Sequence, residues 1–206
     1  MNNPIILASG SPRRAQLLSQ VGIPHKIMVS NIDESAIPLE AAWFEDNDRG
    51  LDAVRAIAKA KVDAVAQALG AQARESTIIG ADTLVYQNGK IFGKPNNQDE
   101  AYEMLSQLQG DSHKVYTGGV ILRSGVYFQI GSVSTVTFRK LSSLEIMEYI
   151  ETGEPMDKAG AYGIQELGAS FVSHIDGDFY GIMGLPIAQV CRILGELGHV
   201  KFMGIR

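Results

Sequence analysis

The residues near the N-terminus have the types and spacing of an anion-binding loop. A short apolar run ends in Ser-Gly-Ser-Pro, which contains Ser9 and Ser11, and the pair Arg13 and Arg14 follows. Ser11 is a good N-cap residue, and the proline after it suits the first position of a helix. Free backbone N–H groups, the helix dipole and two guanidinium groups would then converge. The arginine pair alone could equally be a solvated helix face, but the loop before it favours a site for a phosphate-sized anion.

Two further cations are candidates for phosphate contacts. Lys94 stands between Gly93 and Pro95, a rigid setting that favours a positioned contact over a simple turn residue. On helical spacing alone Lys61 would more often be a solvated surface lysine, and the nearby Lys59 competes for the same role.

Carboxylates follow two predicted strands. Asp82 comes directly after the apolar residues 77–81, and Asp33 and Glu34 follow a shorter candidate strand. Strand ends in α/β sheets face the ligand crevice, so chemistry is favoured for Asp82 over a turn cap, whereas the earlier pair could be a solvated loop. Phosphoryl transfer uses a hard divalent cation with one or two carboxylate ligands. Glu34 and Asp82 could hold Mg²⁺ or Mn²⁺.

An amide in a glycine-rich segment is a candidate for recognition of a base. Gln165 offers both a hydrogen-bond donor and an acceptor, which suits a base edge, although a plain loop residue is the simpler interpretation.

Several other classes of site are disfavoured. The region before Lys94 lacks the first glycine of a P-loop, no G-x-G-x-x-G motif occurs, and the four histidines are scattered without zinc-type spacing. The single Cys191 lies in an apolar helical pattern typical of a structural thiol. A formal net charge of −5 argues against broad nucleic-acid binding. No membrane-length apolar run or signal-peptide pattern is visible, so we expect a cytoplasmic protein.

Predicted helices and strands alternate along the chain without linkers or repeats. Mixed helices, hairpins and isolated strands predict one α/β domain over residues 1–206, with a mixed sheet flanked by helices. We expect a strand at 4–8, a helix from Ser11 to Gly22, a strand at 25–30, a helix at 51–69, a strand at 77–81, a hairpin at 85–92, a helix at 97–108, strands at 114–123 and 126–138, a helix from 142 to 153, a strand at 170–175, and a helix opened by Pro186.

Six ordered blocks give the chain a resemblance to a known family. It resembles the Maf family of nucleoside triphosphate pyrophosphatases over nearly its whole length, and six matches in order are more specific than any one. The matching blocks are residues 8–14 with Leu17 and Leu18, 33–34, 80–83, 93–95, 157–165 and 184–186.

The resemblance implies a fold, an activity and residue roles. Maf-like proteins are similar in fold to inosine triphosphatases, with two lobes around a deep cleft, and hydrolyse nucleoside triphosphates to the monophosphate and pyrophosphate. It further implies a homodimer and a branch that prefers dTTP and UTP. The implied roles are Asp82 as proton acceptor, Glu34 and Asp82 as ligands for Mg²⁺ or Mn²⁺, Ser9, Arg14, Lys61 and Lys94 as phosphate contacts, and Arg13, Thr83 and Gln165 as specificity residues.

Two alternatives from other classes stay open on the sequence. The chain could be a nucleotide-sensing protein that acts on a partner in septum formation without turnover, although Asp82 is intact. It could also use Arg13 and Arg14 to bind nucleic acid, which the acidic balance disfavours. We expect a nucleoside triphosphate substrate and neither nucleic acid nor a membrane as partner.

Overall fold

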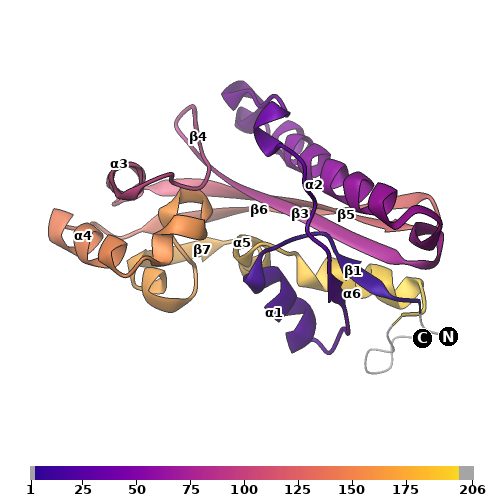
Figure 1. Cartoon of the computed structure of the whole chain (residues 1–206). Coiled ribbons are helices and arrows are strands. Elements are labelled where there is room, and N and C mark those ends of the chain that lie inside the picture. Colours follow the sequence, from indigo (N-terminus) through magenta and orange to yellow (C-terminus); the bar gives the residue numbers. More distant parts are fainter. Residues whose placement is uncertain (1–2, 200–206) are drawn as a thin grey trace.

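A mixed seven-stranded sheet runs through the molecule, with helices on both of its faces (Figure 1). The structure, a computed structural model, describes residues 3–199. The strand order is β2-β1-β3-β5-β6-β7, with β4 paired to β3, and only the β1–β2 and β1–β3 pairs are parallel. The strands are β1 (Ile5–Leu7), β2 (Lys26–Ile27), β3 (Thr77–Gln87), β4 (Lys90–Phe92), β5 (Ser112–Arg123), β6 (Val126–Phe138) and β7 (Val172–Asp176). The predicted α/β class with a mixed sheet is confirmed.

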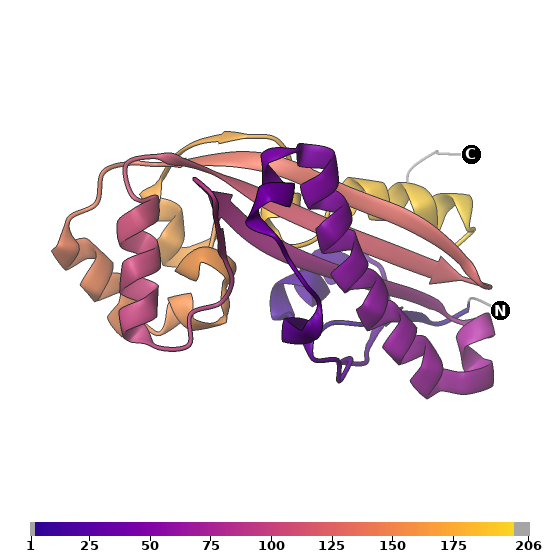
Figure 2. The same ribbon diagram turned by 90° about the horizontal axis from the view of Figure 1, so that it is seen from above.

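The helices divide between the faces and ends of this sheet. The long helix α2 covers one face, and α1 and α6 lie on the opposite face (Figure 1). Seen from above, α3 and α4 lie together at one end of the long strands (Figure 2). The helices are α1 (Pro12–Gln20), α2 (Asn47–Leu69), α3 (Gln98–Leu108), α4 (Ser143–Glu151), α5 (Phe179–Met183) and α6 (Ile187–Glu196).

Most predicted turns and caps are confirmed. Asn88 and Gly89 have φ of 48° and 79°, as a two-residue hairpin requires. Ser142 and Glu145 form a capping box at the start of α4. Gly22 follows α1 with φ of 72°. Other elements differ from the prediction: β2 is only two residues long, α2 begins at Asn47 rather than at residue 51, and the five-residue helix α5 was not predicted.

Alternation along β3 sends neighbouring residues to opposite sides of the sheet. Ile78 and Leu84 pack in the clusters that contain α2 residues, whereas Ile79 and Val85 belong to the large cluster on the other face. Asp82 therefore lies on the α2 side, and its neighbour Thr83 on the side of α1 and α5.

Glycines let α2 approach the sheet closely. A Cβ on Gly80 of β3 would lie 2.6 Å from Val62 Cγ2 and 2.9 Å from the Ala58 carbonyl oxygen. A Cβ on Gly118 of β5 would lie 2.7 Å from the Arg55 backbone nitrogen. Only glycine fits these contacts, and the closeness brings α2 side chains to β3.

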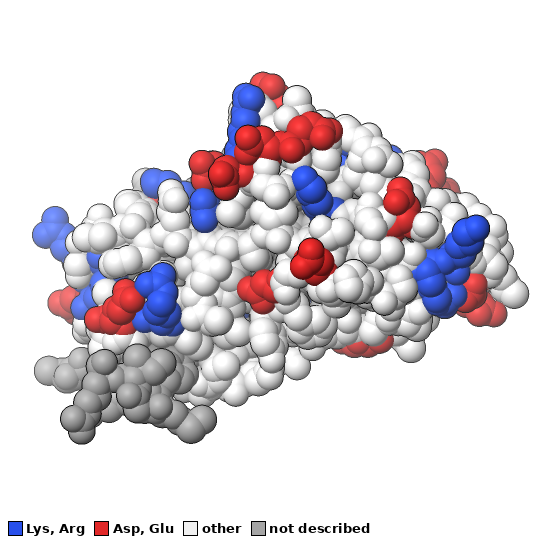
Figure 3. Space-filling model, turned by 180° about the vertical axis from the view of Figure 1, so that it is seen from behind, with Lys and Arg blue, Asp and Glu red and all other residues white. Residues whose placement is uncertain are grey.

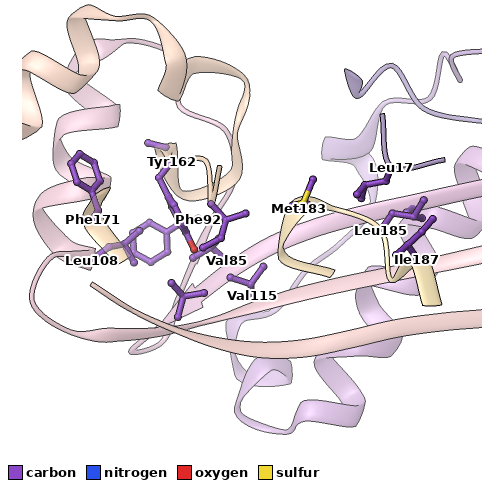
Figure 4. Packing of buried hydrophobic residues seen from close by; sticks show 14 of the residues in the cluster. Leu17, Val85, Phe92, Leu108, Val115, Tyr162, Phe171, Met183, Leu185 and Ile187 are labelled. Atoms are coloured by element: carbon purple, nitrogen blue, oxygen red, sulfur yellow. The ribbon is translucent and has the colours of Figure 1, made fainter. Parts of the chain in front are cut away.

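The largest hydrophobic cluster extends along the other face of the sheet. In Figure 4, Phe92, Tyr162 and Phe171 lie at one end of it, and Leu17, Leu185 and Ile187 at the other. Val85, Val115 and Met183 lie between these two groups. Those three residues also line the cavity described below. The core thus forms the apolar side of the candidate site.

The predicted end of the strand at residue 81 was wrong. β3 continues to Gln87, so Asp82 and Thr83 lie in its middle, because β5 pairs with it from Thr77 to Tyr86. On its other side β1 pairs only as far as Ile79, and β4 begins to pair at Val85. Within the described chain, the intervening residues have no strand beside them on that side. Asp82 therefore reaches the cavity described below through this gap beside β3 rather than from a strand end.

The described residues show neither a membrane-spanning helix nor, on the face in Figure 3, a basic patch. None of its helices is both long and apolar enough to span a membrane. On the face shown in Figure 3, Lys and Arg are interspersed with Asp and Glu and form no continuous basic patch.

Candidate active site

A cavity of about 820 Å³ lies at the gap beside β3, between β1 and β4. Nearly all of the predicted site residues line it. Its apolar lining comes from residues on several elements, among them Val29, Leu39, Ile57, Val115 and Met183. Gln165 is not part of the lining, although Gly163 and Ile164 just before it are. The predicted residues that line the cavity are Ser9, Arg13, Arg14, Glu34, Lys61, Asp82, Thr83 and Lys94.

One lysine joins the two candidate carboxylates. Lys61 Nζ lies 2.6 Å from Asp82 Oδ1 and 3.0 Å from Glu34 Oε2. Lys61 and Asp82 are only 6% and 8% exposed, whereas Glu34 is exposed. Desolvation offsets much of the attraction in a buried ion pair, so such a pair beside a cavity is a stronger indication of function than of stability.

Helical spacing alone favoured a solvated Lys61, and that interpretation was wrong. Counted from Val54, Lys61 is the seventh residue along and falls on the same face as Ile57 and Val65, all of them buried. Lys59 lies on the exposed side and pairs with Asp63 at 2.5 Å. The cavity is therefore lined by Lys61 and not by Lys59.

The donor set suits a small hard cation. Oxygen atoms of Glu34 and Asp82 both lie within hydrogen-bond reach of the same Lys61 nitrogen, so the two carboxylates converge on one point of the cavity. Mg²⁺ is commonly bound by one or two carboxylates, with water and substrate phosphates as its other ligands. In the described residues no group of three or more His, Cys, Asp or Glu could hold a metal ion. Water molecules or substrate phosphates would supply the remaining ligands of a cation held by Glu34 and Asp82.

The Arg14 guanidinium is held on three sides. Its Nη1 donates to Ser9 Oγ at 3.0 Å, Nη2 to Thr83 Oγ1 at 3.1 Å, and Nε to the Gly184 carbonyl oxygen at 2.7 Å. Burial lowers the pKa of Arg14, and the negative charge of Asp82 opposes that shift. A buried guanidinium stays protonated and would gain from an arriving anion.

The loop before α1 uses its serines differently from the prediction. Ser11 stands at the N-cap, but its side chain makes no capping hydrogen bond. Ser9 Oγ instead accepts the Ser11 backbone N–H at 3.2 Å as well as Arg14. The first-turn amides of α1 therefore have no side-chain acceptor of their own, as an anion site requires.

Two cavity residues were missed by the sequence prediction of the site. Asp157 Oδ2 accepts from Arg13 Nη1 at 3.1 Å, and its Oδ1 accepts from Lys158 Nζ at 2.8 Å. Partial burial raises the pKa of Asp157, but the Lys158 and Arg13 contacts outweigh it and lower the pKa overall. Lys158 is 7% exposed and also donates to the Glu154 carbonyl oxygen. Both residues stand at the start of residues 157–165, one of the six blocks that resemble the Maf family. That match was the sequence signal that could have identified them.

Of the two remaining predicted residues, Lys94 lines the cavity and Gln165 does not. Lys94 is exposed, and the carbonyl of the preceding Gly93 accepts the Gly160 N–H at 2.9 Å, which fixes the turn. Gln165 is half-buried at the start of a short 3₁₀ segment.

Comparison with known proteins agrees with this arrangement. The family model described as Maf-like protein matches residues 4–197. A dTTP/UTP pyrophosphatase of Halalkalibacterium halodurans is 42% identical, with 93% of this chain and 94% of that protein covered. Proteins of the same name from Bacillus cereus and Aquifex aeolicus are 43% and 40% identical, with 93% and 94% of this chain and 94% and 95% of those proteins covered. The chain therefore belongs to the Maf-like protein family.

Proposed function

We propose that this protein hydrolyses nucleoside triphosphates, with dTTP and UTP preferred, to the nucleoside monophosphate and pyrophosphate. The observation that carries the proposal is the buried Lys61–Asp82 pair, with Glu34 beside it, in the cavity that also contains Arg14. These are the groups that a charged triphosphate and an attacking water require. The shared name of the relatives from three bacteria supports the same activity.

Asp82 is the proposed proton acceptor. Lys61 holds Oδ1, and among the described residues no donor engages Oδ2. That oxygen can therefore take the proton of a water molecule as it attacks the α-phosphorus. Glu34 and Asp82 would hold Mg²⁺ or Mn²⁺, which when bound neutralises phosphate charge.

The cations of the cavity are the proposed phosphate contacts. Arg14 comes from α1, Lys61 from α2 and Lys94 from the segment after β4, and Ser9 adds a hydroxyl. Donors that hold the β- and γ-phosphates stabilise the charge that develops on the leaving pyrophosphate. Bond cleavage then falls between the α- and β-phosphates.

Base preference is assigned to Arg13, Thr83 and Gln165. An amide can pair with the acceptor-donor-acceptor edge of uracil or thymine, whereas cytosine presents a donor at C4. A buried polar group left unpaired costs about 1–3 kcal/mol, enough for roughly 5- to 150-fold discrimination. Gln165 would have to turn toward the cavity from its place beside Ile164. Function as a homodimer in the cytoplasm stays a prediction.

A substrate panel tests the proposal. Pyrophosphate release is measured for dTTP, UTP, CTP, ATP and GTP with Mg²⁺, with Mn²⁺ and with chelator. We expect the highest kcat/KM for dTTP and UTP and no turnover without metal. Equal kcat/KM for purine and pyrimidine substrates would contradict the specificity assignment. Tight nucleotide binding without turnover would instead favour the nucleotide-sensing alternative.

A further inference from the structure

A buried threonine outside the cavity lining completes the support of Arg14. Thr117 lies on β5 directly opposite Thr83 of β3, and it is 0% exposed. Its Oγ1 lies 3.0 Å from Thr83 Oγ1 and 2.7 Å from the Gly181 carbonyl oxygen. Thr83 Oγ1 in turn lies 3.1 Å from Arg14 Nη2.

The chemistry of these groups fixes the direction of every hydrogen bond. A carbonyl oxygen can only accept, so the single hydroxyl proton of Thr117 is donated to Gly181. Thr83 must then donate its own proton to Thr117. A guanidinium can only donate, so Thr83 accepts from Arg14 through a lone pair. Thr83 has no second proton for a substrate.

The chain of hydrogen bonds closes into a ring. The Gly184 N–H donates to the same Gly181 carbonyl oxygen at 2.8 Å. The Gly184 carbonyl oxygen accepts Arg14 Nε at 2.7 Å. Thr117 therefore reaches the guanidinium by two routes, through Thr83 to Nη2 and through the turn after α5 to Nε.

We propose that Thr117 is a positioning residue that fixes the Arg14 guanidinium for the substrate phosphates and acts through Thr83 and the α5 turn. Without its hydroxyl, Gly181 loses a donor and the Thr83 proton loses its acceptor. Arg14 then keeps its charge but not its orientation. The proposal rests on the proposed function in that Arg14 is taken to bind phosphate.

Two substitutions separate the hydroxyl from the shape of the side chain. Thr117→Val keeps the shape and removes the hydroxyl, whereas Thr117→Ser keeps the hydroxyl. Thr77→Val is the matched control, because Thr77 is also a 0% exposed threonine with a bonded hydroxyl. It lies at the start of β3, outside the cavity lining, and its hydroxyl contacts His199. Thr117→Ala replaces the valine variant if circular dichroism shows that the latter does not fold.

Binding is measured with α,β-imido-dUTP, which cannot be cleaved between its α- and β-phosphates, and turnover with dTTP. We expect Thr117→Val to weaken binding and to raise KM by about 5- to 30-fold, the scale of one lost buried hydrogen bond. Thr117→Ser should restore both, and Thr77→Val should change thermal stability alone. Unchanged binding by Thr117→Val, or equal impairment of the serine variant, would overturn the proposal.

A double-mutant cycle tests the route through Thr83. Since Thr83 and Thr117 act in one chain, Thr83→Val with Thr117→Val should lose less binding than the sum of the single losses. Additive losses would show that Thr117 does not act through Thr83. A wild-type protein that binds the analogue but hydrolyses nothing would overturn the proposed function alone, whereas one that does not bind it would overturn both.

Discussion

At the residue scale, Asp82 has the most direct role in the proposed chemistry. Asp82→Asn keeps the shape of the side chain but can neither accept a proton nor neutralise a cation. We expect kcat to fall by about 10²- to 10⁴-fold, the scale for removal of a positioned base. Steady-state kinetics measures the loss, and Asp63→Asn on the exposed side of α2 is the control that should retain activity. A folded Asp82→Asn with wild-type kcat would show that the carboxylate is structural.

His113 gives the stability of the protein a pH dependence that can be measured. The ring is 2% exposed, lies edge-on to Phe138 and Tyr162, and its Nε2 is 2.8 Å from the Tyr162 hydroxyl. Burial lowers its pKa from 6.5 to about 4. Between these two values the unfolded chain binds a proton that the folded chain does not, so stability falls with falling pH. The full loss is roughly 3 kcal/mol.

His113→Phe should flatten this dependence. The substitution keeps the aromatic packing and removes the titrating group, although the Tyr162 hydroxyl loses its partner. Urea unfolding of wild type and variant at about pH 7.5 and about pH 5 compares the two slopes. Equal losses of unfolding free energy in the two proteins would contradict a buried neutral His113.

At the element scale, helix α2 directs two nearby lysines, Lys59 and Lys61, to different sides. Lys61 faces Asp82 and the cavity, whereas Lys59 faces solvent and Asp63. We expect Lys61→Met to lower kcat/KM by about 10²-fold, the scale for loss of one preorganised electrostatic contact. Lys59→Met should leave kcat/KM unchanged. The same loss in both variants would point to a general effect of charge rather than to the cavity.

The close packing of α2 on β3 can be tested through a glycine. Gly80→Ala places a Cβ within 2.6 Å of Val62 and 2.9 Å of the Ala58 carbonyl, so the helix must move away. Overpacking of this kind costs about 1–3 kcal/mol of unfolding free energy. Because the shift moves Lys61 from Asp82, activity should fall as well.

Gly195→Ala is the matched control for this substitution. Gly195 lies in α6, and apart from its chain neighbours and the backbone of its own helix no atom lies within 4 Å of its Cβ position. Alanine should therefore stabilise the helix by about 0.5–1 kcal/mol. Thermal unfolding measures both variants. A Gly80→Ala protein as stable and active as wild type would contradict the close packing of α2 on β3.

Local sequence patterns predicted most helices, strands and turns. The features that they missed depend on contacts between residues far apart in the chain. The hairpin at Asn88 and the capping box at Ser142 depend on nearby residues and were predicted with their turns. The full length of β3 depends on β5, whose Tyr116 pairs with Leu84 from far along the chain. The helix α5 is too short for a periodic signal. Asp157 was missed because nothing local indicates that Arg13 would reach it.

At the scale of the whole molecule, the site results from how the sheet is paired. β1 pairs with β3 only as far as Ile79, and β4 pairs with it only from Val85. Side chains on both faces of the middle of β3 therefore line the cavity. Asp82 and Thr83 point to opposite faces of the sheet. Asp82 contacts Lys61 of α2 on one face, and Thr83 contacts Arg14 of α1 on the other, so residues from both faces line one cavity. The acidic chain thus gathers a local cluster of cations at the cavity, where we propose that the triphosphate binds.

Hydrolysis of dTTP in ¹⁸O-labelled water shows which phosphorus atom the water attacks. If the protein directs water to the α-phosphorus, mass spectrometry will find the label in the monophosphate, and the other product will be unlabelled pyrophosphate. Label in orthophosphate, with dTDP as the second product, would mean attack at the γ-phosphorus and would contradict the account of the site.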